Sequence, residues 1–197
     1  MLDSTLPDVG TTIFTRMWAL AAETGAIHLS QGDPDFAAPL ALREARARAT
    51  MEGHPQYAPM AGLPALREQL ALQLQSHRGV TCDPETEITV VPGATEGIFC
   101  AVMACVRPGD EVIVLDPCYD SYAPSIKLAG GSAVHVPLQP GSFSPDWQQV
   151  GDAISPRTRM IMINSPHNPT GSTLAGEDLD ELERLTLAHD LLVCSDE

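Results

Sequence analysis

The residue of this chain best suited to chemistry is an asparagine that stands between two proline-containing turns. The stretch Asn-Ser-Pro-His-Asn-Pro-Thr-Gly occupies residues 164–171 and follows the apolar run 160–163. Proline fixes φ and has no backbone N–H, so strand pairing must stop within this stretch. Asn168 is therefore expected at the carboxyl end of a strand, the edge at which open α/β sheets bind ligands.

A glycine-containing turn at residues 93–97, Gly-Ala-Thr-Glu-Gly, suits a phosphate group. It joins a predicted strand to a predicted helix, and the first N–H groups of a helix, with the positive end of its dipole, favour an anion. Thr95 could add a hydroxyl donor. The alternative is an ordinary turn in which Thr95 is the helix N-cap. The spacing matches neither a dinucleotide-binding fingerprint nor a P-loop.

Two further residues follow predicted strands. Tyr119, within residues 116–122, could lie flat on a planar ligand, a contact worth on the order of 1 kcal/mol. The alternative is a tyrosine at the edge of the core. Asp196 follows the apolar run 191–193, where a carboxylate needs a cationic partner such as a protonated pyridine nitrogen. The alternative there is the N-cap of a following helix.

Alternating strands and helices must position these residues. The predicted strands are residues 88–91, 112–116, 133–136, 159–163 and 191–194. The predicted helices are residues 13–23, 40–52, 63–78, 95–106, 122–129, 145–154 and 177–189, with Ser144 as the N-cap of the helix at 145–154. This order predicts an α/β fold: a three-layer αβα arrangement around a mostly parallel sheet, with the strand ends on one side.

Composition excludes several classes of partner. The formal net charge of −15 argues against nucleic acid and anionic membranes, which need basic patches. No run of about 18 apolar residues is present, and residues 1–4 lack the basic flank of a signal peptide. We therefore expect no membrane span and a cytoplasmic protein. The five cysteines and six histidines show no ligand spacing, so we predict reduced thiols and no metal site.

Taken together, these motifs resemble the fold-type I pyridoxal-phosphate-dependent aminotransferases of class I/II, closest in character to methionine or glutamine/kynurenine aminotransferases. The resemblance runs in order through residues 31–36, 57–67, 93–96, 116–122, 167–171 and 195–197. It implies an aspartate-aminotransferase-like large domain. Residues 1–37 would then form an N-terminal arm and substrate-loop segment, and residues 38–197 an incomplete large domain that binds pyridoxal 5'-phosphate.

The resemblance also implies roles for individual residues. The cofactor-binding residues would be Gly93, Ala94, Thr95, Tyr119, Asn168, Asp196 and Tyr57. Asn168 would bind the ring hydroxyl oxygen, Asp196 the pyridine nitrogen, and Tyr57 the phosphate of a neighbouring subunit, which implies a homodimer. Gly32 would bind the carboxylate of the substrate and Phe14 would line the substrate pocket. The substrates would be an amino acid and a 2-oxo acid.

One part of the family pattern is missing. The Schiff-base lysine and the arginine that binds the substrate carboxylate both lie downstream of the Ser-Asp-Glu motif, which here ends the sequence. Lys127 stands within a predicted helix and is expected at the surface. We therefore expect an N-terminal portion of an aminotransferase, with no catalytic residue of its own and no activity alone.

Two alternatives stay open. A carbon–sulfur β-lyase of the cystathionine type uses the same fold, because fold does not fix function. A non-catalytic remnant of the fold is the other alternative. Its DNA-binding variant is disfavoured, since only thirty residues precede Gln31 and the net charge is −15.

Overall fold

The structure is a computed structural model that describes residues 4–32, 34–53 and 57–197. The chain folds as two compact units. One contains residues up to Gly10 together with Pro92–Glu197, and the other is Thr11–Val91. The predicted boundary after residue 37 falls inside the second unit, and the division into residues 1–37 and 38–197 stays a prediction.

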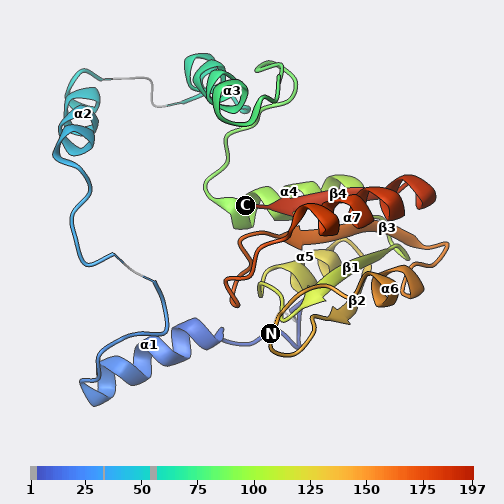
Figure 1. The fold of residues 1–197 in the computed structure, drawn as a ribbon. Coiled ribbons are helices and arrows are strands. Elements are labelled where there is room, and N and C mark those ends of the chain that lie inside the picture. Colours follow the sequence, from blue (N-terminus) through green and yellow to red (C-terminus); the bar gives the residue numbers. More distant parts are fainter. Residues whose placement is uncertain (1–3, 33, 54–56) are drawn as a thin grey trace. The chain divides into compact units, whose positions relative to one another are not determined.

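A four-stranded parallel sheet forms the centre of the first unit (Figure 1). Strand β1 (Glu111–Asp116) pairs with β2 (Ser132–Pro137) on one side and with β3 (Thr158–Asn164) on the other. Strand β4 (Leu192–Asp196) pairs with β3, which gives the order β2-β1-β3-β4. Four of the five predicted strands are confirmed, and all four carboxyl ends lie at one edge.

Helices cover both faces of this sheet, which confirms the three-layer αβα fold (Figure 1). Helices α4 (Ala94–Cys105) and α5 (Tyr122–Leu128) pack on one face, while α6 (Trp147–Asp152) and α7 (Gly176–His189) pack on the other. Side chains of β1 alternate between the two layers. Those facing α4 and α5 are Val112 and Val114, and those facing α6 and α7 are Ile113 and Leu115. Each buried aliphatic side chain stabilises the fold by about 1.5–3 kcal/mol.

The predicted strand at residues 88–91 is wrong. These residues belong to no strand among those the structure describes, although they include the β-branched run that favours one. One backbone hydrogen bond is formed there, from Val90 N–H to the Ala61 carbonyl at 3.0 Å. A β-strand needs a ladder of such bonds with a neighbouring strand, and a single bond to a loop does not supply it.

The predicted N-cap of α6 is also wrong. The helix begins at Trp147, and its N-cap is Asp146, whose carboxylate accepts hydrogen bonds from the N–H groups of Gln148 and Gln149. Ser144 lies in the preceding loop, where its N–H bonds to the Ser142 hydroxyl at 3.3 Å. A carboxylate beside the positive helix end is a stronger cap than a hydroxyl two residues earlier, because its charge also interacts with the helix dipole.

The second unit contains the three predicted helices of the first half of the sequence, α1 (Ile13–Thr24), α2 (Leu40–Met51) and α3 (Pro64–Arg78). Helix α3 begins with proline and ends at Gly79, whose positive φ of 69° closes the helix as predicted. None of the described helices combines the length and apolar character that a membrane-spanning helix needs.

A buried arginine connects the segments before and after α3 in this unit. Arg67 of α3 is 4% exposed. Its guanidinium donates to the carbonyls of Gly62 and Pro84 and pairs with the Glu85 carboxylate. The planar fork of an arginine can bind three acceptors at once, so Arg67 connects both ends of the segment that surrounds α3.

Candidate functional site at the carboxyl edge of the sheet

Asn164 fixes the backbone at the carboxyl end of β3, just before Asn168. It is paired in register with Asp196 of β4, and its side-chain N–H₂ group donates to the Asp196 carbonyl at 2.7 Å. Its side-chain oxygen accepts the N–H of Asn168 at 2.6 Å. The Asn168 side chain is exposed and makes no hydrogen bond with the described residues. One asparagine thus fixes the backbone of the other and leaves its amide available for a ligand.

Asp196 lies at the end of β4 and accepts a hydrogen bond from the Tyr122 hydroxyl at 2.6 Å. Among the described residues, the ion pairs do not include Asp196. Burial, with the hydrogen bond and charge of Asp196, raises the pKa of Tyr122 well above its ordinary value. Tyr122 therefore stays protonated and donates, so the carboxylate has an orienting partner and no cationic one.

Tyr119 connects Tyr122 with the start of helix α4. The two tyrosine rings meet edge to face, with centroids 5.8 Å apart and planes at 72°. The Tyr119 hydroxyl lies 3.4 Å from the Thr95 hydroxyl. The structure thus brings Thr95, Tyr119, Tyr122 and Asp196 together in one continuous set of contacts.

The start of α4 contradicts one of the two alternatives for the glycine turn, the one in which Thr95 is the N-cap. Gly93 is the N-cap, with a φ of 98° that favours glycine, and no side chain caps the helix. Thr95 is therefore not the cap, because the helix already begins at Ala94. The first N–H groups of a helix lack intrahelical partners, so this uncapped end can receive an anion.

A buried histidine in the same segment was missed by sequence reasoning. His167 is 7% exposed, and its Nδ1 lies 2.8 Å from the Thr170 hydroxyl. Burial lowers its pKa, an effect that hydrogen bonds with the backbone of Pro117 and Leu115 oppose. His167 therefore joins the β3 exit to the β1 exit. Its position beside Asn168 was the available signal, but sequence alone does not show burial.

Three other predicted residues lie in the second unit. Tyr57 is 89% exposed, Gly32 is exposed in a loop, and Phe14 is half-buried on α1. Asp33, in the same loop as Gly32, lies outside the described residues. The roles of Tyr57, Gly32 and Phe14 stay predictions.

The fold is that of an α/β protein, and the candidate site lies at the carboxyl edge of its parallel sheet. Comparison with known proteins gives its family. Residues 24–197 match aminotransferase class I and II. The chain is 47% identical to a methionine aminotransferase of Escherichia coli K12, over 98% of this chain and 50% of that protein. It is 43% identical to a probable N-succinyldiaminopimelate aminotransferase of Mycobacterium tuberculosis H37Rv, over 100% of this chain and 50% of that protein.

Solved structures agree with this result. An Escherichia coli structure reported with a methionine aminotransferase function matches with a TM-score of 0.95 and 46% identity, covering 100% of this chain and 52% of that chain. Aspartate aminotransferase of Thermus thermophilus with maleate matches with a TM-score of 0.93 and 38% identity, covering 100% and 53%. The chain belongs to the aminotransferase class I and II family, and it spans about half the length of these relatives.

Proposed function

We propose that this chain forms the cofactor-binding part of an aminotransferase that uses pyridoxal 5'-phosphate to move an amino group between an amino acid and a 2-oxo acid. The observation that carries the proposal is the environment of Asp196. Its carboxylate is oriented by Tyr122 but has no cationic partner among the described residues. A half-buried carboxylate favours such a partner, and a protonated pyridine nitrogen supplies one.

The remaining residues at this edge fit the same cofactor. The uncapped N-terminus of α4, with Gly93, Ala94 and Thr95, offers N–H and hydroxyl donors to a phosphate group. Tyr119 offers an aromatic face for the pyridine ring. The free amide of Asn168 offers a donor to the ring hydroxyl oxygen. The site thus offers three features that fit pyridoxal 5'-phosphate. They are hydrogen-bond donors for its phosphate, an aromatic face for its ring and a carboxylate for its ring nitrogen.

The side chains of this site would orient the cofactor and hold a proton on its ring. When bound, pyridoxal 5'-phosphate supplies an electron sink for bond cleavage at the α-carbon of the amino acid. Asp196 would hold a proton on the pyridine nitrogen. Tyr122 orients the Asp196 side chain, while Asn164 fixes its backbone through the bond at 2.7 Å. This support from two elements keeps the carboxylate in one position.

Lys127 does not supply the amino group that the family uses as a base. Its Nζ pairs with the Asp8 carboxylate at 2.7 Å, and its side chain is 50% exposed on α5. This confirms the predicted surface position. Because Lys127 is the chain's one lysine, we expect the 197-residue polypeptide not to transaminate by itself.

The assembly and location follow as parts of the same proposal. We propose a homodimer in which the exposed Tyr57 binds the phosphate of the neighbouring subunit, while Gly32 and Phe14 contact the substrate. We propose the cytoplasm as the location, because all five cysteines are free and a reducing compartment keeps them so.

Methionine is the amino donor to test first, since one relative is named a methionine aminotransferase. The assay uses the protein purified from its natural source, with added pyridoxal 5'-phosphate, methionine and a panel of 2-oxo acids. Formation of the amino acid that corresponds to the added 2-oxo acid supports the proposal. Release of pyruvate and ammonia from cystathionine without amino transfer would show a β-lyase instead, and turnover of neither substrate would show a non-catalytic remnant.

A further inference from the structure

Asp116, Cys118 and His135 form a second cluster at the carboxyl edge of the sheet. Each offers one ligand atom, and these atoms lie within 4.8 Å of one another. None of the three has a role in the cofactor site proposed above. Their side chains differ in chemistry: a carboxylate, a thiol and an imidazole.

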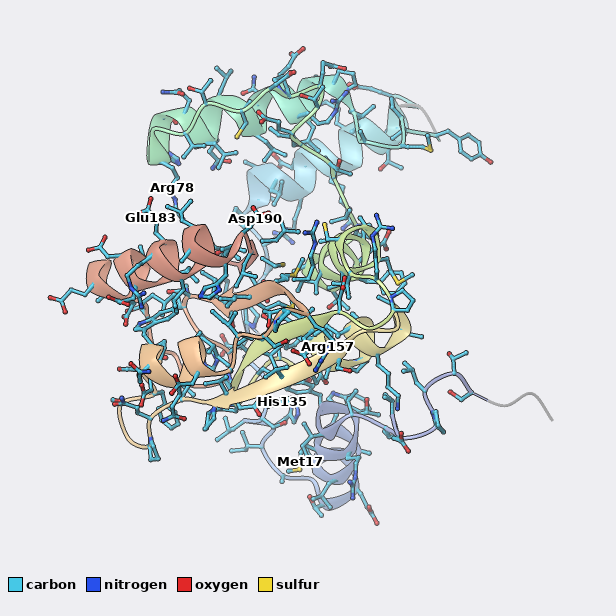
Figure 2. The ribbon with its side chains drawn as sticks, turned by 90° about the vertical axis from the view of Figure 1, so that its right-hand side faces the viewer. Met17, Arg78, His135, Arg157, Glu183 and Asp190 are labelled. Carbon is cyan, nitrogen blue, oxygen red and sulfur yellow. The ribbon has the colours of Figure 1, made fainter. Side chains whose placement is uncertain are left out.

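The parallel pairing of β1 and β2 creates the cluster. Asp116 is the last residue of β1, and Cys118 follows it in the turn that leads to Tyr119. His135 belongs to β2 (Figure 2). Its register partner in β1 is Val114. Side chains alternate along a strand, so His135, Val114 and Asp116 share the face that packs against α4 and α5.

The His135 and Asp116 side chains are already in contact, while burial and the neighbouring Asp116 carboxylate raise the pKa of the Cys118 thiol. The His135 Nδ1 atom lies 3.0 Å and 2.9 Å from the two oxygens of Asp116. The side chains of His135 and Asp116 are 47% and 38% exposed, so an ion from solvent can reach them. Imidazole nitrogen, thiolate sulfur and carboxylate oxygen are the three ligand types of zinc in proteins.

We propose that Asp116, Cys118 and His135 bind one divalent transition-metal ion of the zinc type, with a water molecule as the fourth ligand. On binding, the Cys118 thiol releases its proton to the buffer. The ring proton of His135, which lies on Nδ1 toward the Asp116 carboxylate, moves through solvent to Nε2, so that Nδ1 is free to bind the ion. Ligand atoms around tetrahedral zinc are separated by roughly 3.5 Å. The cluster must therefore contract from 4.8 Å, which rotation of the exposed His135 side chain permits. The bound ion would link β2, through His135, to the turn that contains Cys118 and Tyr119.

Metal titration of the full chain tests this proposal. Calorimetry with Zn²⁺ is expected to give one ion per chain, and Co²⁺ is expected to give thiolate-to-cobalt charge-transfer absorption. His135→Gln should weaken Zn²⁺ binding on the order of a hundredfold, since loss of even an outer-shell partner costs about 10–100-fold. Cys118→Ser should abolish the charge-transfer band. The controls are Cys100→Ser and His189→Gln, which alter exposed residues outside the cluster and should change neither result.

Thermal unfolding gives a second readout that does not need the half-buried Cys118 to be altered. At the same Zn²⁺ concentration, the melting temperature of the unaltered chain should rise more than that of His135→Gln, because a ligand that binds only the folded state stabilises it more strongly the higher its affinity. Absence of saturable Zn²⁺ binding would overturn the proposal. Equal binding in the unaltered chain and in His135→Gln would overturn it too. The cofactor proposal is independent of either outcome.

Discussion

The buried His167 makes the stability of the segment that carries Asn168 depend on pH. The residue is 7% exposed, and burial lowers its pKa from the ordinary value of 6.5. A histidine with a lowered pKa in the folded state favours the neutral form there. Its contribution to stability is therefore present above the unfolded pKa and is lost as pH falls through the folded pKa. Protonation would place a charge in a buried position between the exits of β1 and β3.

We expect the free energy of unfolding to decrease as pH falls from about 7 to about 5, and His167→Gln to flatten this dependence. This pH range lies above the ordinary pKa values of the carboxylates whose pKa is lowered by partners, which are 3.8 for Asp8, Asp83 and Asp146 and 4.5 for Glu111. Urea unfolding at several pH values measures the slope. His189→Gln, at an exposed position on α7, should keep the slope of the unaltered chain. An unchanged slope in His167→Gln would contradict the assignment.

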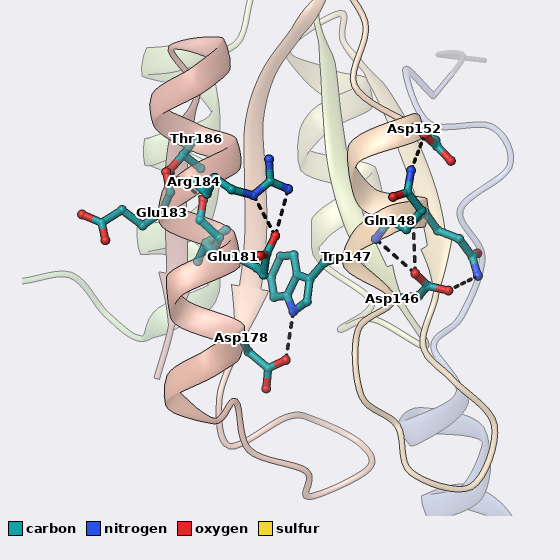
Figure 3. A network of polar contacts seen from close by, with 11 residues as sticks. Asp146, Trp147, Gln148, Asp152, Asp178, Glu181, Glu183, Arg184 and Thr186 are labelled. Atoms are coloured by element: carbon teal, nitrogen blue, oxygen red, sulfur yellow. Dashed lines mark hydrogen bonds and ion pairs between the residues drawn. The ribbon is translucent and has the colours of Figure 1, made fainter.

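Helices α6 and α7 are joined by a side-chain contact that spans the layer on one face of the sheet. The Trp147 indole N–H donates to Asp178 Oδ1 at 2.9 Å (Figure 3). The other oxygen of Asp178 accepts the Ala175 N–H at 2.8 Å and so caps α7. Behind this contact, Val150 packs in one cluster with Leu182 and Leu185. Asp178 therefore caps the start of α7 and also holds α6 in position through Trp147.

Asp178→Ala is expected to lower the free energy of unfolding by about 1–3 kcal/mol, because it removes a helix cap and a hydrogen bond to a charged acceptor. Urea unfolding followed by tryptophan fluorescence measures both the loss and the changed environment of Trp147. Asp180→Ala is the matched control: it removes the same charge from an exposed position of the same helix. If both variants unfold at the same urea concentration, the capping role is wrong.

Elements were predictable where local pattern agrees with tertiary packing. The β-branched or apolar runs of β1 and β3 became strands because each finds a parallel neighbour on both sides. The run at 88–91 has the same local pattern but no neighbouring strand among the described residues, so it forms none. Glycines with positive φ ended α1 and α3, as at Gly79, because that signal is local.

Contacts between distant residues were not predictable in the same way. The motif order led to Asp196 and Tyr119, but not to the hydrogen bond of Asp196 with Tyr122, which spans 74 residues. Likewise, Cys118 and His135 show no ligand spacing in the sequence. They come together only because β2 pairs in parallel with β1. Such contacts depend on strand order and register, which sequence periodicity does not define.

At the scale of the whole molecule, the proposed cofactor site contains segments from several strand and helix ends of the first unit. Residues 93–95, 119–122, 164–168 and 196 meet at one edge of the sheet. A ligand bound there should restrict all of these segments together. Helix α3 in the second unit contains none of the predicted cofactor contacts, so it provides an internal reference.

Hydrogen exchange of the full chain tests this arrangement. Pyridoxamine 5'-phosphate is the suitable probe, because it has no aldehyde and cannot react with the exposed Lys127. We expect slower exchange in the segments around residues 94–96, 119–122 and 164–168, and unchanged exchange in α3. The reason is that bound ligand stabilises the local structure that binds it, by about 2.7 kcal/mol at a hundredfold excess over the dissociation constant.

Asp196→Asn makes the test specific for the pyridine nitrogen. Asparagine can still accept the Tyr122 hydrogen bond, so the sheet edge should keep its structure. The lost charge should cost about 1.5–3 kcal/mol of binding, a dissociation constant roughly tenfold to a hundredfold weaker. Asp180→Asn removes the same charge from an exposed position on α7 and should bind as the unaltered chain does. If Asp196→Asn retains full affinity while the protected segments stay the same, then the ligand occupies this edge without its ring nitrogen against Asp196, because only that contact depends on the charge.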